Sequence, residues 1–219
     1  MKRISRYLPI LLALFALPLV ARAQGPSFDV GVGFGTNYDK ANAGGYDNAN
    51  SENAYGPCTP NTGDTDCDSN PALRNFSLGF SGDAMFRKNL GFGADAIFQP
   101  AQSAFGPFNT RQSFYDFDVI FAPINEKRVS LKLAGGIGGA RTSVYVPVST
   151  PLGGNSSELY NENSHFALHA SAGVQIYVTE HVFIRPQFDY RYIPNFNEEY
   201  GSNSEYGGSV WVGYSFGDR

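Results

Sequence analysis

The stretch that decides the fold reads FDVGVGFG and covers residues 28–35. Its bulky apolar residues occupy every second position and alternate with an aspartate and three glycines. A period of two places successive side chains on opposite faces of a β-strand. The stretch therefore predicts a strand with one bulky apolar face and one small or polar face.

The same alternation recurs seven more times along the chain. The predicted strands cover 28–35, 76–86, 90–98, 115–121, 129–138, 166–178, 182–192 and 206–216. Several bulky residues break the rule by standing on the small or polar face: Ile97, Phe114, Ile120, Tyr177 and Phe183. Pro186 stands on the apolar face of the seventh strand, where it removes one backbone donor and predicts a local irregularity.

The connections between these strands alternate in length. Long connections are predicted near 39–73, 100–112, 146–164 and 194–204, and short turns near 87–89, 122–128 and 179–181. In an up-and-down meander, all the long connections then lie at one end and all the short turns at the other. That asymmetry is typical of transmembrane β-barrels.

Side-chain size predicts which face points outward. The small face is rich in glycine, which suits the narrow interior of an eight-stranded barrel, whereas the bulky face suits lipid. Aromatic residues also gather near both strand ends, as in the two interfacial girdles of membrane barrels. They are Phe28, Phe86, Phe121 and Phe216 at one end, and Tyr38, Phe76, Phe98, Phe166, Tyr192 and Tyr206 at the other. The alternative is a secreted soluble barrel that buries the apolar face.

Composition and the first residues limit the classes of function. The chain has 219 residues, of which 16% are charged, and a net charge of −4, which argues against a nucleic-acid partner. Residues 1–23 combine a basic start, a short apolar run and the small-x-small end Ala21-Arg22-Ala23, which predicts a cleaved signal peptide. The remaining residues, 24–219, form a single predicted barrel domain.

The predicted long connection near 39–73 carries two further candidates. Cys58 and Cys67 are the only cysteines, and in an exported protein they predict a disulfide. Aspartates at positions 64, 66 and 68 are spaced as in calcium loops, but the glycine and glutamate that an EF-hand needs are missing. We interpret Asp64, Asp66 and Asp68 as a solvated acidic loop and keep a weak calcium site as the alternative.

Residues 24–219, the predicted mature chain, resemble the small eight-stranded outer-membrane barrels of the OmpA-barrel and OmpX type. The opening stretch 28–35 and the closing stretch VWVGYSF at 210–216 carry this resemblance. The closing strand is similar to the family's assembly signal, with Tyr214 and Phe216 in the aromatic positions, although three residues follow the last aromatic. The resemblance implies a Gram-negative outer membrane, lipid around the barrel, recognition by the barrel-assembly machinery, extracellular long loops and no cofactor.

Charged residues on the small face form the main candidate site. They are Asp29, Asp83, Asp95, Asp116, Asp118, Lys132, Arg185, Asp189 and Arg191. Charges inside a narrow barrel must be paired or hydrated, so we expect an ion-pair network that fills the lumen. The alternative is a narrow path that prefers cations, because aspartates outnumber basic residues on this face.

His169 and Ser171 are the one arrangement that suggests catalysis. Barrel-type lipid A deacylases carry a His-x-Ser pair followed by asparagine, but Ala172 follows here. Both residues are also predicted to face the lumen, whereas an enzyme acting on lipid needs them on the lipid side. We therefore expect a non-enzymatic envelope protein with interacting surface loops, then a small-solute or ion channel, and last a lipid-modifying enzyme.

Overall fold

The structure is a computed structural model, and it describes residues 27–39, 73–105, 108–149, 155–200 and 202–217. The predicted signal peptide, the cysteine pair and the acidic stretch at 64–68 lie outside these residues. The strands are β1 (Ser27–Asp39), β2 (Leu73–Arg87), β3 (Leu90–Phe98), β4 (Ser103–Phe105), β5 (Phe108–Asn125), β6 (Val129–Ser149), β7 (Asn155–Tyr177), β8 (Val182–Tyr192) and β9 (Ser204–Phe216). A short helix, α2 (Phe196–Tyr200), lies between the last two strands.

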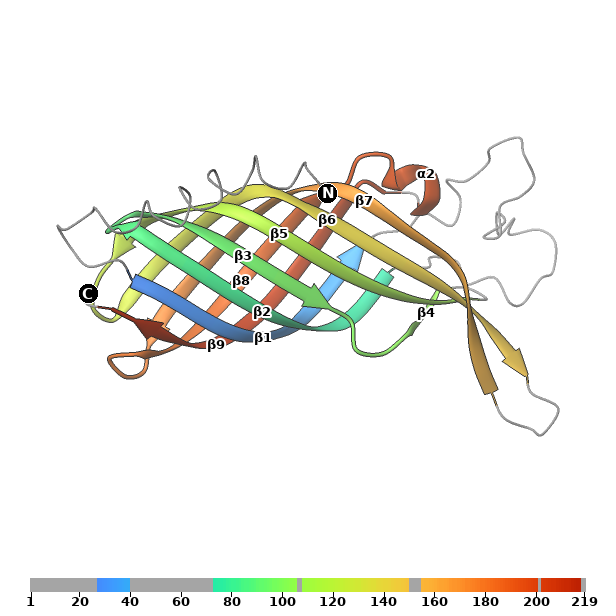
Figure 1. The fold of residues 1–219 in the computed structure, drawn as a ribbon, viewed down its shortest axis with the longest axis horizontal. Coiled ribbons are helices and arrows are strands. Elements are labelled where there is room, and N and C mark those ends of the chain that lie inside the picture. Colours follow the sequence, from blue (N-terminus) through green and yellow to red (C-terminus); the bar gives the residue numbers. More distant parts are fainter. Residues whose placement is uncertain (1–26, 40–72, 106–107, 150–154, 201, 218–219) are drawn as a thin grey trace, which may run out of the picture.

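The strands form one antiparallel sheet that closes on itself (Figure 1). The sheet order is β3-β2-β1-β9-β8-β7-β6-β5-β4, and pairing between β3 and β5 completes the ring. Eight strands therefore form the closed barrel, while β4 pairs only with the start of β5. The predicted all-β, eight-stranded, antiparallel up-and-down barrel is confirmed, with this three-residue strand in addition.

The two faces of the wall are as the period of two predicts. The bulky residues point outward, where Phe80, Phe117 and Phe166, for example, are more than half exposed. The predicted lumen charges point inward, and all except Asp95 are buried. The bulky exceptions to the alternation also point inward and are buried: Ile97, Phe114, Ile120, Tyr177 and Phe183. Ile97, Ile120 and Phe183 occupy space in the lumen that a glycine on a neighbouring strand leaves open.

Short turns join β2 to β3, β5 to β6 and β7 to β8, and we call this the short-turn end. The opposite end, which we call the long-loop end, differs from the prediction in three places. Residues 146–164 are mostly not a loop, because β6 and β7 continue as a hairpin up to the pair Ser149–Asn155 (Figure 1). Residues 100–112 contain β4 and the beginning of β5, and residues 194–204 contain α2.

The extended hairpin has a simple physical explanation. The outer part of the hairpin extends beyond the pairing of β7 with β8, so it does not separate lipid from lumen and alternation between apolar and polar residues is not required there. The prediction relied on alternation and therefore ended the first strand too early, at 138, and began the second too late, at 166.

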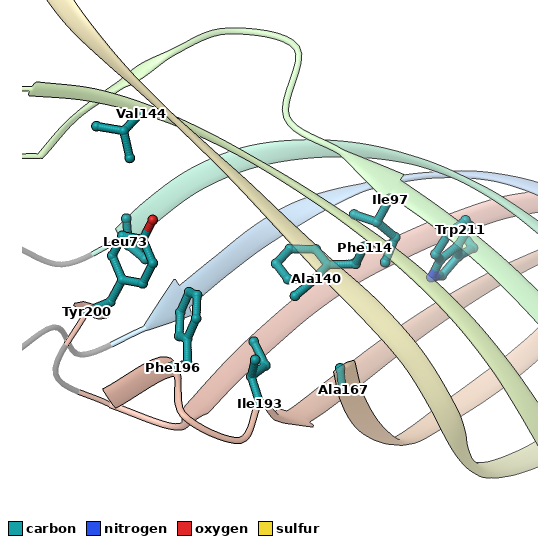
Figure 2. Packing of buried hydrophobic residues seen from close by; sticks show 10 residues of the cluster. All are labelled: Leu73, Ile97, Phe114, Ala140, Val144, Ala167, Ile193, Phe196, Tyr200 and Trp211. Atoms are coloured by element: carbon teal, nitrogen blue, oxygen red, sulfur yellow. The ribbon is translucent and has the colours of Figure 1, made fainter. Parts of the chain in front are cut away.

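An apolar cluster closes the lumen at the long-loop end. Ile193, Phe196 and Tyr200, from the segment that contains α2, are almost fully buried. Figure 2 shows them beside Leu73, Phe114, Ala140 and Val144 of the barrel wall, with Trp211 at the far end of the cluster. We call Ile193, Phe196 and Tyr200, which lie in the connection between β8 and β9, the plug.

No helix in the described part of the chain is long and apolar enough to cross a bilayer.

Candidate functional site

The lumen is the candidate site, and its first layer lies near the short-turn end. Lys132 on β6 places Nζ 2.7 Å from Oδ2 of Asp29 and 2.6 Å from Oδ2 of Asp83. Asp29 and Asp83 stand directly opposite each other on β1 and β2, where two like charges would repel. The ammonium group of Lys132 therefore neutralises a repulsive cross-strand pair from the other side of the barrel.

Further donors complete this layer. Arg185 donates from Nη1 to Oδ2 of Asp83 at 2.6 Å. Gln175 donates from Nε2 to Oδ2 of Asp29 at 3.0 Å, and the Ser215 hydroxyl donates to the other oxygen of Asp29. Residues from β1, β2, β6, β7, β8 and β9 are thus joined in one network.

His169 forms the middle layer. Its Nδ1 lies 2.8 Å from Oδ2 of Asp118, and its Nε2 lies 3.3 Å from Oδ1 of Asp189. Both ring nitrogens therefore face carboxylates, which leaves neither as a base for Ser171. His169 is also buried inside the barrel, away from the outer wall. This geometry fits a lumen histidine bonded to carboxylates and gives no support to a nucleophile–base pair.

Arg191 stands directly opposite His169 on the neighbouring strand β8 and continues the network. It donates to Oδ2 of Asp116 from Nε at 3.1 Å and from Nη2 at 2.7 Å. The guanidinium also lies over the ring of Phe114, 4.5 Å from the centroid. A planar cation is suited to such combined ionic and aromatic contact.

Trp211 occupies the lumen beside two glycines. A Cβ atom on Gly33 would come within 2.4 Å of the indole, and one on Gly79 within 2.6 Å. Only glycine leaves room for the ring at these two positions. Trp211 Nε1 donates to the Ser209 hydroxyl at 2.9 Å, and Arg185 lies 5.6 Å from the ring centroid.

Two small cavities lie among these residues. One cavity of about 10 Å³ is lined by Asp83, Asp95, Asp118 and neighbouring residues. Another cavity, of about 20 Å³, lies between Asp29 and Tyr177. Volumes of this size hold roughly one water molecule. Asp95 stands opposite Asp116 on the wall, and its Oδ1 has no hydrogen-bond partner among the described residues.

Sequence reasoning missed two parts of the lumen. Asp39 and Glu205 form a buried cross-strand pair at the long-loop end, and Glu205 also stands opposite Arg191. Their positions continue the inward parity of β1 and β9, so a longer strand prediction would have found them. The plug has no such signal, because its segment shows no period of two.

The two residues of the predicted assembly signal lie on the outer wall near the short-turn end. Tyr214 and Phe216 are exposed, and their rings lie 4.7 Å apart between centroids. Phe216 also pairs with Phe28 across the seam between β9 and β1. Among the described residues, no group of three or more His, Cys, Asp or Glu side chains is arranged to hold a metal ion.

Comparison with known proteins agrees with this architecture. The family model for the outer membrane protein beta-barrel domain matches residues 10–216, so the chain belongs to this family. Membership of the family implies a location in the bacterial outer membrane. No curated protein matches the chain.

Solved structures of small outer-membrane barrels share the fold. Neisserial surface protein A (NspA) superposes with a TM-score of 0.53 at 14% identity, covering 89% of this chain and 99% of its own. The attachment invasion locus protein Ail of Yersinia pestis, in complex with a heparin analogue, gives a TM-score of 0.50 at 15% identity. That match covers 89% of this chain and all of Ail. At these identities, the similarity concerns the fold.

Proposed function

We propose that the chain is a non-enzymatic barrel with a closed lumen, which stabilises the outer membrane and exposes its long-loop end to the cell surroundings. The observation that carries this proposal is the filling of the lumen. Ion pairs join opposite walls, and the plug covers them at the long-loop end. A transport protein needs a continuous path, and the described lumen residues leave cavities of about one water molecule.

Single-channel recording in a planar bilayer tests the closed lumen. We expect the folded wild-type protein to give no steady conductance steps, with a heat-sensitive gel shift as the control for folding. Steady cation-selective steps that change with Asp116→Asn would instead identify a channel. Asp116 is the appropriate probe because its carboxylate lies in the lumen and is held by Arg191.

The absence of catalysis is tested separately. We expect the lipid A profile of cells that express the wild-type protein to equal that of cells carrying the empty vector. If the wild type alters the profile and either His169→Ala or Ser171→Ala removes the change, the protein is an enzyme.

The surface role is supported by the β6–β7 hairpin. β7 pairs with β6 along its whole length, whereas its pairing with β8 begins at Leu168, so the hairpin extends beyond β8. Leu159 and Tyr160 are more than half exposed on this hairpin. Exposed apolar side chains on a projecting hairpin are features of surfaces that bind another protein.

Labelling on intact cells tests the orientation. In a background where both cysteines are replaced by serine, Tyr160→Cys marks the hairpin and Thr179→Cys marks the short-turn end. We expect a membrane-impermeant maleimide to label the first variant on intact cells and the second only after the membrane is opened. The reverse pattern would show that the hairpin faces the periplasm.

A further inference from the structure

The outer wall carries a shallow apolar groove of about 740 Å³ that crosses strands from β2 to β6 by way of β1, β9, β8 and β7. Its lining includes the small residues Gly208 and Ala172 and the short ring of Pro186. Bulky side chains also line it, among them Phe34, Phe76 and Phe188. A Cβ atom placed on Gly208 would meet nothing within 4 Å. The outer surface of the barrel therefore has open space at this glycine.

The sequence explains why the groove lies here. Gly208 pairs with Phe188, Phe188 pairs with Ala172, and the next outward position on β9, Val210, pairs with Pro186. Most outward positions of the barrel carry Phe, Val, Ile or Leu, whereas Gly208, Pro186 and Ala172 lie at diagonal positions on three adjacent strands, with Phe188 and Val210 beside them. The resulting depression is a consequence of side-chain size and needs no backbone distortion.

Polar groups are placed at the long-loop side of the groove. Arg74 lies two residues before Phe76 on the same outward face of β2, and its guanidinium lies 5.2 Å from the centroid of the Tyr38 ring. Tyr38 pairs with Tyr206 on β9, and the rings of Tyr206 and Tyr190 lie 5.4 Å apart. An exposed cation and a row of tyrosines thus lie next to an apolar groove.

We propose that this groove binds one phosphate-bearing membrane lipid, with an acyl chain along Gly208 and Pro186 and the phosphate on Arg74. Arginine is well matched to phosphate, because its planar guanidinium forms charge-assisted hydrogen bonds in pairs. Tyrosine at the same level suits the interface between chains and headgroups. The volume lies within the range of small-molecule sites, about 300–1,000 Å³. The site goes beyond the proposed function, because a barrel can be closed and structural without a specific lipid.

Native mass spectrometry of the full-length protein, purified in detergent, tests the proposal. The probe is dimyristoyl phosphatidylglycerol, and the comparison lipid is dimyristoyl glycerol, which has the same chains but no phosphoglycerol headgroup. We expect one saturable adduct with the first probe and at least a roughly tenfold weaker adduct with the second. Inorganic phosphate should not displace the lipid, because the chain contributes to binding.

Matched variants locate the site. Gly208→Phe places a ring in the groove, and because its Cβ atom meets nothing within 4 Å the backbone need not move. The variant should weaken the adduct at least tenfold, which is roughly the loss expected when buried apolar contacts are removed. Gly82→Phe is the control, since Gly82 also faces outward with no atom closer than 3.8 Å to a built Cβ. Arg74→Gln should weaken binding of the phosphate-bearing lipid to the level of dimyristoyl glycerol, whereas Arg87→Gln, at the other end of β2, should not.

Three results would overturn the proposal, provided that each variant keeps the heat-sensitive gel shift. The first is equal binding by wild type and Gly208→Phe, and the second is an equal loss in Gly82→Phe. The third is a mass of two protein chains in wild type that Gly208→Phe abolishes, which would assign the groove to a second copy. None of these results depends on whether the lumen conducts.

Discussion

Arg191 and Asp116 lie three strands apart around the ring, on β8 and β5, and the guanidinium of Arg191 bridges this distance with two hydrogen bonds to one carboxylate oxygen. Both residues are fully buried. The pair therefore joins two walls of the barrel through its interior. Because neither partner can reach bulk water, the loss of one leaves the other charge in an unfavourable environment.

Removal of Arg191 alone should destabilise the barrel strongly. We expect Arg191→Met to lower the free energy of unfolding by about 3–5 kcal/mol, the usual cost of leaving a buried charge unpaired. The double variant Arg191→Met/Asp116→Asn should recover most of this loss. Urea unfolding in lipid vesicles, followed by the gel shift, measures both. Equal midpoints for wild type and the single variant would show that the pair is not important for stability.

The contact between Gly33 and Trp211 should make the lumen sensitive to a single methyl group. Gly33→Ala places a Cβ atom within 2.4 Å of the indole, so we expect overpacking to cost about 1–3 kcal/mol. Gly82→Ala, which meets no atom within 3.8 Å, should be nearly neutral in the same urea titration. If Trp211→Phe fails to rescue Gly33→Ala, the clash is not with the indole.

The plug should shield the interior from solvent, and Trp211 reports on this because it is the single tryptophan. We expect the double variant Phe196→Ala/Tyr200→Ala to increase quenching of its fluorescence by acrylamide about twofold or more, because both side chains belong to the cluster that contains the indole. Tyr160→Ala, on the exposed hairpin, is the control. Unchanged quenching in the double variant would show that the lumen is sealed below the plug.

The hairpin should respond to acid through Glu162, which lies beyond the ring on β7. The hydrogen bond from Arg141 lowers the pKa of Glu162 below its ordinary value of 4.5. Because the folded pKa is the lower one, the contact stabilises the hairpin above pH 4.5 and loses this effect as the pH falls through the lowered pKa. The effect is small, since both side chains are accessible to solvent.

Amide hydrogen exchange of the hairpin at different pH values measures this effect. We expect protection of the amides around Glu162 to fall below pH 4.5 in the wild type. Glu162→Gln should show, at every pH, the reduced protection that the wild type shows in acid. If the wild type and this variant have the same pH profile, another group determines the pH dependence of amide protection in the hairpin.

The sequence predicts the barrel wall well because the wall obeys one local rule. Lipid outside and a narrow lumen inside impose alternation on every strand, so inward residues such as Asp83 and Lys132 are identified from parity alone. Which cation joins which carboxylate depends on contacts across the lumen. Lys132 and Asp29 are 103 positions apart, and no local pattern relates them.

The parts that the sequence does not predict lie where the alternation rule no longer applies. The β6–β7 hairpin extends above the ring, and Phe196 and Tyr200 enter the lumen from a connection rather than from a strand. The histidine at position 169 was identified as a candidate, but its two carboxylate partners come from β5 and β8. Such tertiary contacts become visible only in the closed barrel.

The seam between β1 and β9 has a consequence for biogenesis. It pairs the first described strand of the chain with the last, with Phe28 opposite Phe216 and Gly33 opposite Trp211. The ring therefore cannot close until nearly the whole polypeptide has been delivered, and contacts between residues so distant in the chain form slowly. The indole of Trp211 packs against Gly33 only when β9 pairs with β1. Burial of Trp211 therefore marks the step at which the open sheet, with two exposed edges, closes into a barrel.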